Sequence, residues 1–135
     1  MPVLQVPLST SGAILDVEVR ASAVLGPRGS GSASIFEALI DTGATITAIS
    51  PEVVTAVQPQ QIGVMPITRP NGTIAWVNSY DVRIQFGSQG RFHDVEAVET
   101  QPATPNIDVL IGLDLLLRIR MGWDGRGRLL TLVVR

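Results

Sequence analysis

Apolar and polar residues alternate along much of this chain, in short runs that turn-forming residues separate. Alternation with a period of two is typical of strands that bury one face. The runs are rich in Val, Ile, Leu and Thr, whereas Gly, Pro, Asn and Ser lie between them. The pattern predicts a mostly β protein with strands at 3–8, 14–24, 34–40, 80–86, 91–98 and 129–134.

Other local signals predict one more hairpin and two short helices. Asn71-Gly72 lies between the two extended arms of segment 64–77, and Asn-Gly between β-rich arms is a strong hairpin signal. Ser50 before Pro51 is typical of a helix start, with Ser as the N-cap. A second helix of one or two turns is predicted over 113–119.

The length of 135 residues suits one domain, and a chain of this size buries roughly two thirds of the surface that its unfolded form exposes. We therefore expect a single domain over 1–135. Segment 25–32 is rich in Gly and Ser and is predicted to be a flexible loop, not a domain boundary.

Composition excludes several classes of function. The chain has no Cys and one His, which leaves too few ligands for a usual zinc site, so we expect no metal and no cofactor. A formal net charge of -2 argues against a nucleic-acid partner. No apolar run approaches the ~18 to 20 residues that span a bilayer, so we expect no membrane partner. We expect a soluble protein of unknown compartment, either cytoplasmic or released from a longer precursor. His93 is predicted to face solvent on strand 91–98.

One carboxylate follows directly after an apolar run, a position in which a charged side chain does not stabilise the fold by itself. Asp41 ends the apolar run 38–40 and is followed by Thr42, Gly43 and Ala44. A charged group at the end of a buried strand needs hydrogen-bond donors, or it raises the cost of folding. Thr42 can supply a hydroxyl, and Gly43 lets another backbone segment approach closely.

A second segment strengthens this observation. In 106–116 an apolar strand ends at Ile111-Gly112, and Asp114 follows two positions later. Together the two segments resemble the active-site loop and the apolar-Gly-helix segment of the single-lobe, retropepsin-like aspartic proteases, of cellular, bacterial or retroelement type. The resemblance implies a closed β-barrel with a flap hairpin and one or two short helices.

The resemblance also implies a function. Members of this family are aspartic endopeptidases, in which two carboxylates activate a water molecule that attacks a peptide bond. Because one chain has one Asp-Thr-Gly, the second carboxylate is expected to be Asp41 of another copy in a homodimer. Thr42 and Gly43 are expected to support the active-site loop. Two carboxylates side by side do not both ionise easily, so activity is expected on the acidic side.

The expected substrate is a polypeptide bound as an extended strand. Ala44 and Leu110 match family positions that line the central substrate pockets, and Asn71 and Gly72 lie at the predicted flap tip. Asp108 is placed either at the rim of the same pocket or on the surface. In retroviral relatives the chain termini interleave between subunits, which implies such a role for strand 129–134.

Two departures and two alternatives accompany this interpretation. Retroviral members often carry an ion pair at positions that here hold Thr45 and Leu113, so dimer strength is left open. One alternative is a non-proteolytic binding or dimerisation module on the same β-barrel, with Asp41 as a structural acceptor. The other is a monomeric enzyme that uses Asp108 or Asp114 as its second carboxylate.

Overall fold

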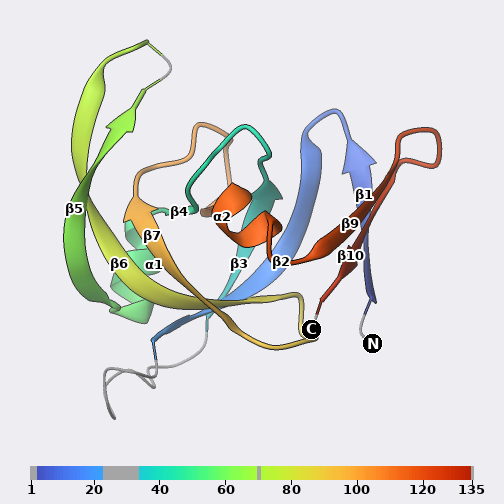
Figure 1. Cartoon of the computed structure of the whole chain (residues 1–135), viewed down its shortest axis with the longest axis horizontal. Coiled ribbons are helices and arrows are strands. Elements are labelled where there is room, and N and C mark those ends of the chain that lie inside the picture. The colour runs from blue at the N-terminus through green and yellow to red at the C-terminus, as the bar shows by residue number, and fades with distance from the viewer. Residues whose placement is uncertain (1–2, 23–33, 70, 135) are drawn as a thin grey trace.

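The structure is a computed structural model that describes residues 3–22, 34–69 and 71–134. The predicted loop 25–32 and the end of the predicted strand 14–24 lie outside these residues. The mostly β prediction is confirmed (Figure 1). The described elements are β1 (Val3–Ser9), β2 (Gly12–Ala21), β3 (Ser34–Ile40), β4 (Ala48–Ile49), α1 (Pro51–Val57), β5 (Gln60–Thr68), β6 (Ile74–Phe86), β7 (His93–Glu99), β8 (Val109–Ile111), α2 (Leu113–Leu116), β9 (Arg120–Asp124) and β10 (Leu129–Val133).

Six of these strands form a closed barrel. The strand order is β5-β6-β7-β4-β8-β3-β2-β1-β10-β9, and an additional β6–β2 pairing closes the ring of β2, β6, β7, β4, β8 and β3. Alternate residues of the long strands point inward, so that Val17 and Val19 of β2 and Val82 and Ile84 of β6 have no exposed surface. The closed β-barrel expected from the resemblance is therefore present.

Strand β7 turns its single histidine toward the interior and not toward solvent as predicted. His93, Val95 and Ala97 of β7 face the interior, and only 4% of His93 is exposed. The rings of His93 and Phe86 pack in a T-shaped arrangement, with 5.8 Å between ring centroids. The prediction of a solvent-facing His93 was wrong, because an alternating pattern fixes two faces of a strand without fixing which of them is buried.

A long hairpin projects from the barrel. β5 pairs with β6 along its whole length, and the upper part of this hairpin rises beyond the barrel at the left of Figure 1. This hairpin is the predicted flap, and its turn holds Asn71 and Gly72. Figure 1 also shows α2 next to the connection between β3 and β4, which carries Asp41.

The terminal strands form a small sheet within one chain. β10 pairs with β1 on one side and with β9 on the other, both antiparallel. Both edges of β10 are therefore occupied by its own chain, and the expectation that strand 129–134 itself pairs between subunits was wrong. Arg120–Asp124 forms the outer strand β9, which the sequence pattern did not predict, and all of its residues are exposed.

The two helices are short. α1 begins as predicted, since the Ser50 side chain accepts a hydrogen bond from the Val53 amide at 3.3 Å. α2 ends at Leu116, earlier than the predicted 119, because the chain continues in turns that lead into β9. Neither described helix has the length and apolar character to cross a membrane.

Candidate active site

Asp41 stands at the end of β3 in a tight loop. Its amide donates to the Ile111 carbonyl at 3.0 Å, which continues the pairing between the parallel strands β3 and β8. Its side chain is partly exposed, and Oδ1 accepts a hydrogen bond from the Gly43 amide at 3.0 Å. A Cβ at position 43 would lie 3.3 Å from that Oδ1 atom, a tight contact. Gly43 thus keeps the carboxylate supported and open to solvent.

The start of α2 holds the same loop from the other side. The Leu113 amide donates to the Ala44 carbonyl at 2.8 Å, and the Asp114 amide donates to the Thr45 carbonyl at 3.2 Å. This close approach depends on Gly112, because a Cβ there would lie 2.7 Å from the carbonyl carbon of Ile46. The two segments that carry the family resemblance are therefore in direct backbone contact.

A buried threonine completes this support. The Thr47 hydroxyl donates to Asp114 Oδ1 at 2.7 Å, and the Thr47 amide donates to Oδ2 at 3.0 Å. The Leu115 amide also donates to Oδ1, at 2.8 Å, and the Gly112 amide donates to the Thr47 hydroxyl at 3.2 Å. Thr47 is fully buried. Asp114 therefore serves as an acceptor that binds the loop to α2.

Asp108 has a separate structural role. The Ser50 hydroxyl donates to Asp108 Oδ1 at 2.9 Å, and the Ser50 amide donates to the Asp108 carbonyl at 2.8 Å. The carboxylate thus holds the residue that caps α1. The side chain belongs to this contact and not to the lining of the cavity beside the Asp41 loop.

A cavity of about 390 Å³ lies between the Asp41 loop and the flap. The loop contributes residues 43–46, the end of β5 contributes 66–68, and the barrel contributes Ala48, Val98, Thr100 and Leu110. The predicted residues Gly43, Ala44 and Leu110 therefore meet at one cavity. Asp41 and Thr42 directly precede its wall without being part of it.

The sequence reasoning missed the contribution of β5 to this cavity. Pro66, Ile67 and Thr68 line it, together with Val98 from β7. A usable signal was present, because these β5 residues belong to the arm that precedes the predicted Asn-Gly turn. Val98 carried no such signal, since the pairing of β7 with β4 brings it there.

Asn71 and Gly72 lie at the flap tip, apart from the cavity wall. Asn71 Oδ1 accepts hydrogen bonds from the Thr73 amide at 3.0 Å and from the Thr73 hydroxyl at 2.6 Å. Gly72 has φ of 85°, a conformation that favours glycine, and its amide donates to the Arg69 carbonyl at 2.9 Å. Both residues build the turn in this structure.

We searched the described part of the chain for side chains that together could bind a metal ion. Within residues 3–22, 34–69 and 71–134, the His, Asp and Glu side chains form no group of three that could hold a metal ion. The Asp41 loop offers a supported, partly exposed carboxylate next to the cavity beneath the flap. A carboxylate in this position can take up or release a proton.

Comparisons with known proteins agree with this arrangement. The family described as "gag-polyprotein putative aspartyl protease" matches residues 31–118, which include the Asp41 loop, the flap and α2. No curated protein sequence matches the chain.

Solved structures show the same fold. A retropepsin-like aspartic protease from Rickettsia conorii is 13% identical with a TM-score of 0.62, over 97% of this chain and 90% of that one. An aspartic proteinase from Irpex lacteus is 14% identical with a TM-score of 0.52, over 99% of this chain and 47% of that one. At these identities the likeness concerns the fold, whereas the family match covers more than half of the chain. The chain belongs to the gag-polyprotein aspartyl protease family, and this membership and the retropepsin-like fold support a protease function in general.

Proposed function

We propose that this protein is an aspartic endopeptidase whose active site forms from Asp41 of two copies of the chain. The observation that carries the proposal is the Asp41 loop itself. Its carboxylate is supported by the Gly43 amide, its backbone is fixed to β8 and α2, and it borders a cavity beneath the flap. No part of this support needs a second carboxylate from the same chain.

The proposed mechanism uses the two Asp41 side chains as a pair that shares one proton. The ionised carboxylate takes a proton from a water molecule as that water attacks the scissile carbonyl carbon. The protonated partner donates a hydrogen bond to the carbonyl oxygen, where negative charge develops. Aspartic proteases are the standard example of such a shared proton. The bond from the Gly43 amide to Asp41 Oδ1 keeps this oxygen oriented.

The substrate is proposed to be an extended polypeptide. A strand laid between the flap and the barrel can form main-chain hydrogen bonds, while alternate side chains enter pockets. Ala44 and Leu110 line the cavity together with Ile67 and Val98, so apolar side chains are expected next to the cleaved bond. Asn71 and Gly72 are proposed to cover the substrate from the flap tip.

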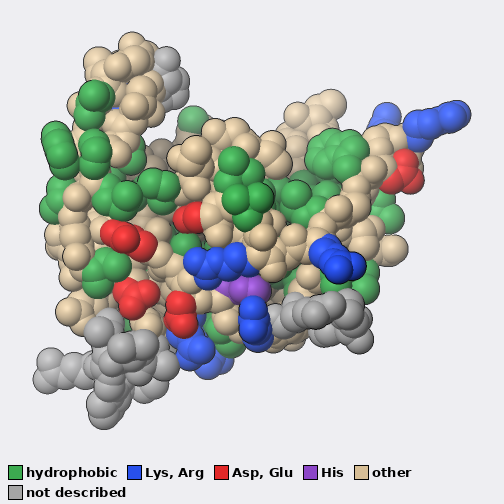
Figure 2. Space-filling view, viewed as in Figure 1, with side chains coloured by type: hydrophobic (Ala, Val, Ile, Leu, Met, Phe, Trp, Pro, Cys, Tyr) green, Lys and Arg blue, Asp and Glu red, His purple; other side chains and the backbone are tan. Residues whose placement is uncertain are grey.

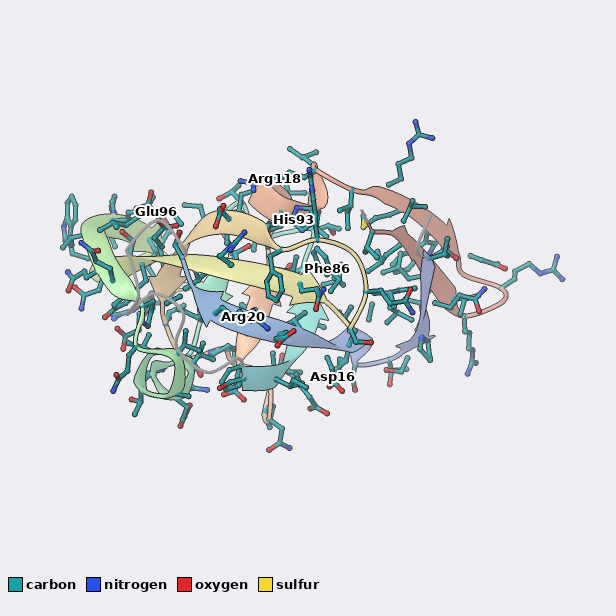
Figure 3. All side chains as sticks on the ribbon, turned by 90° about the horizontal axis from the view of Figure 1, so that it is seen from below. Asp16, Arg20, Phe86, His93, Glu96 and Arg118 are labelled. Atoms are coloured by element: carbon teal, nitrogen blue, oxygen red, sulfur yellow. The ribbon has the colours of Figure 1, made fainter. Side chains whose placement is uncertain are left out.

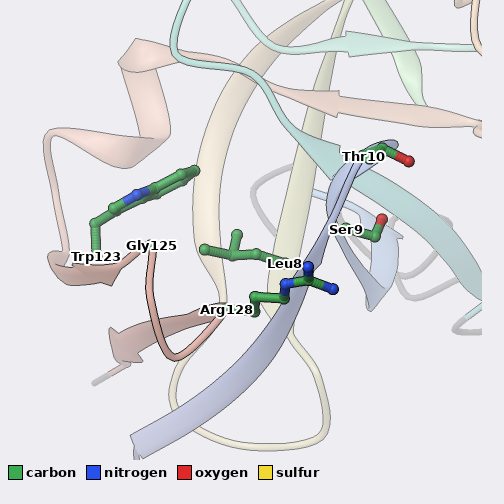
Figure 4. Close-up of a pocket in the computed structure, with 6 residues that line it drawn as sticks. All are labelled: Leu8, Ser9, Thr10, Trp123, Gly125 and Arg128. Carbon is green, nitrogen blue, oxygen red and sulfur yellow. The ribbon is translucent and has the colours of Figure 1, made fainter.

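The terminal sheet supports the proposed dimer. β9 is the outer strand of the sheet β1-β10-β9, and unpaired strand edges are templates for pairing with another chain. Two large apolar side chains lie on it, Met121 at 39% and Trp123 at 69% exposed. Trp123 also borders a hollow of about 270 Å³ opposite Leu8 (Figure 4). We propose β9 as the principal contact between the copies, in place of strand 129–134.

Chain lengths add a further argument. This chain aligns with 47% of the Irpex lacteus proteinase, so two copies would account for about its whole length. A homodimer of single-lobe chains satisfies this relation.

The alternative of a monomeric enzyme needs Asp108 or Asp114 as the second carboxylate. Both carboxylates already accept hydrogen bonds, Asp108 from Ser50 and Asp114 from Thr47, so neither is available for this role.

The test is cleavage of an unstructured protein at acidic pH by wild type, Asp41→Asn and the control Asp16→Asn. Asp16 is exposed on β2, so its substitution makes the same chemical change away from the site. We expect cleavage by wild type and by the control, and none by Asp41→Asn, with equal melting temperatures. The optimum is expected at about pH 4 to 6, with a bell-shaped profile because both the base and the acid are needed.

Three results would count against the proposal. Wild-type cleavage by Asp41→Asn would remove the catalytic role of Asp41. A monomer that is fully active at nanomolar concentration in sedimentation experiments would remove the shared site. A stable wild-type dimer that cleaves nothing across the pH range would support the non-proteolytic module.

A further inference from the structure

A second hollow lies at the junction of β7, β9 and β10. Its volume is about 350 Å³, and its lining includes Arg91, His93, Arg118, Arg120 and Val133. None of these residues lines the cavity beside Asp41. Figure 3 shows Arg118 next to His93, with Phe86 on the other side of the imidazole. The hollow therefore has a different chemistry from the candidate active site.

The hollow is positively charged. Three arginines line it, and no acidic residue belongs to its described lining. Asp94 lines the adjoining hollow and pairs with Arg83 Nε at 3.2 Å. Figure 2 shows positively charged side chains above and below the imidazole on this face. Arg118 donates from Nη1 to the Asp94 carbonyl, and the other N–H groups of its guanidinium leave further donors.

His93 gives this cluster an unsatisfied polar atom. The residue is 4% exposed, and its Nε2 atom is buried without a hydrogen-bond partner in the described part of the chain. Burial, and then the charges of Arg91 and Arg118, lower the pKa of this imidazole, whereas Asp94 acts in the opposite direction. A buried ring nitrogen without a hydrogen-bond partner, next to arginine side chains, is an environment that a bound anion would improve.

We propose that this hollow is a binding site for a phosphate group, held by Arg91, Arg118 and Arg120, with His93 Nε2 as a further donor. Arginine forms charge-assisted, bidentate hydrogen bonds with phosphate oxygens, and three guanidinium groups match a doubly charged anion better than a carboxylate. Binding in this way requires the exposed arginine side chains to turn toward the anion and to uncover Nε2, which is buried in the free protein. The source is either free phosphate or a phosphate monoester.

The single histidine of the chain makes the test direct. The imidazole resonances of His93 are followed by NMR at fixed pH and ionic strength, while inorganic phosphate, phenyl phosphate or acetate replaces chloride. We expect a saturable shift with phosphate and a higher pKa of His93 in the bound state, because the anion stabilises the imidazolium. Phenyl phosphate binding as tightly as inorganic phosphate would indicate a monoester ligand, and weaker binding would indicate free phosphate.

Variants separate the site from general attraction of anions. Arg91→Gln and Arg120→Gln are each expected to weaken phosphate binding roughly tenfold, equivalent to about 1.4 kcal/mol. Arg126→Gln removes the same charge at the exposed β9–β10 turn, outside the hollow, and should leave the affinity unchanged. Arg118→Gln should weaken binding too, but it also removes the contact with the Asp94 carbonyl. Arg120 lies on β9, the proposed contact between the copies, so Arg91→Gln decides the outcome.

The proposal is overturned if the His93 resonances respond to phosphate only linearly and no more than to chloride. It is overturned equally if acetate binds as tightly as phosphate, or if Arg126→Gln weakens binding as much as Arg91→Gln. None of these outcomes depends on peptidase activity, so the proposal stands apart from the proposed function.

Discussion

Replacing Asp114 by Asn distinguishes a residue that supports the active-site loop from one that reacts. The carboxylate accepts three hydrogen bonds, two at Oδ1 from the Thr47 hydroxyl and the Leu115 amide, and one at Oδ2 from the Thr47 amide. An asparagine keeps one acceptor oxygen. Its amide nitrogen then faces an N–H donor of Thr47, or the oxygen turns toward that donor and abandons the other two.

The expected cost follows from these contacts. A hydrogen bond to a charged acceptor contributes about 1.5 to 3 kcal/mol, and a buried donor left without a partner costs about 1 to 3 kcal/mol. Thr47 is fully buried, so water cannot replace the lost acceptor. We expect a loss of about 3 kcal/mol in the free energy of unfolding, which lowers the melting temperature by roughly 10 °C in a chain of this size.

Thermal unfolding followed by circular dichroism measures this change, with Asp16→Asn as the matched control. Below its lowered transition, Asp114→Asn should retain peptidase activity, because the group that it lacks touches the loop and not the reacting atoms. An unchanged melting temperature together with complete loss of activity would refute this reasoning. That result would restore Asp114 as a second carboxylate within one chain.

Three further outcomes are expected. Gly112→Ala should cost about 1 to 3 kcal/mol in chemical denaturation, because its Cβ would press on the Ile46 backbone at 2.7 Å; no change would contradict the close approach. The pKa of His93 is lowered from 6.5, so wild-type stability should fall as pH drops below 6.5, where the unfolded chain takes up the proton first. Urea denaturation of His93→Gln at two pH values should show a smaller fall, and an equal one would rule His93 out. Trp123→Glu should dissociate the dimer in sedimentation experiments and make specific activity fall further on dilution, whereas an unaltered dimer would exclude β9 as the contact.

The sequence contained the local part of the site. Asp41-Thr42-Gly43 and Gly112 followed by Asp114 were recognisable because each depends on neighbouring residues: an apolar strand, a carboxylate or glycine at its end, and a helix start. Ser50 as the N-cap of α1 was predictable for the same reason. The barrel followed from the resemblance of these segments to a known family and not from strand periodicity alone.

The tertiary part of the site was beyond the sequence pattern. Thr47 and Asp114 are 67 residues apart, and nothing local to Thr47 indicates its partner. The pairing of β10 with β1 and β9 is a matter of strand order, and the alternation of apolar and polar residues does not predict strand order. The orientation of His93 depends on a one-residue choice of face, since a shift by one position exchanges the inner and outer residues of a strand.

The first part of strand β6 belongs to the flap and its second part belongs to the barrel. We expect the two parts to differ in mobility, with the change at Ser79. Residues 74–78 pair only with β5, whereas residues 79–84 pair with β7 and residues 82–86 with β2. Ser79 is buried, and its hydroxyl donates to Glu96 Oε2 at 2.6 Å. Amide hydrogens before Ser79 should therefore exchange through local opening of the flap, and those after it only when the barrel unfolds. We therefore expect the flap to bend at this residue without disturbing the barrel. Substitutions at its exposed Ile74 and Trp76 should alter substrate access and leave global stability unchanged.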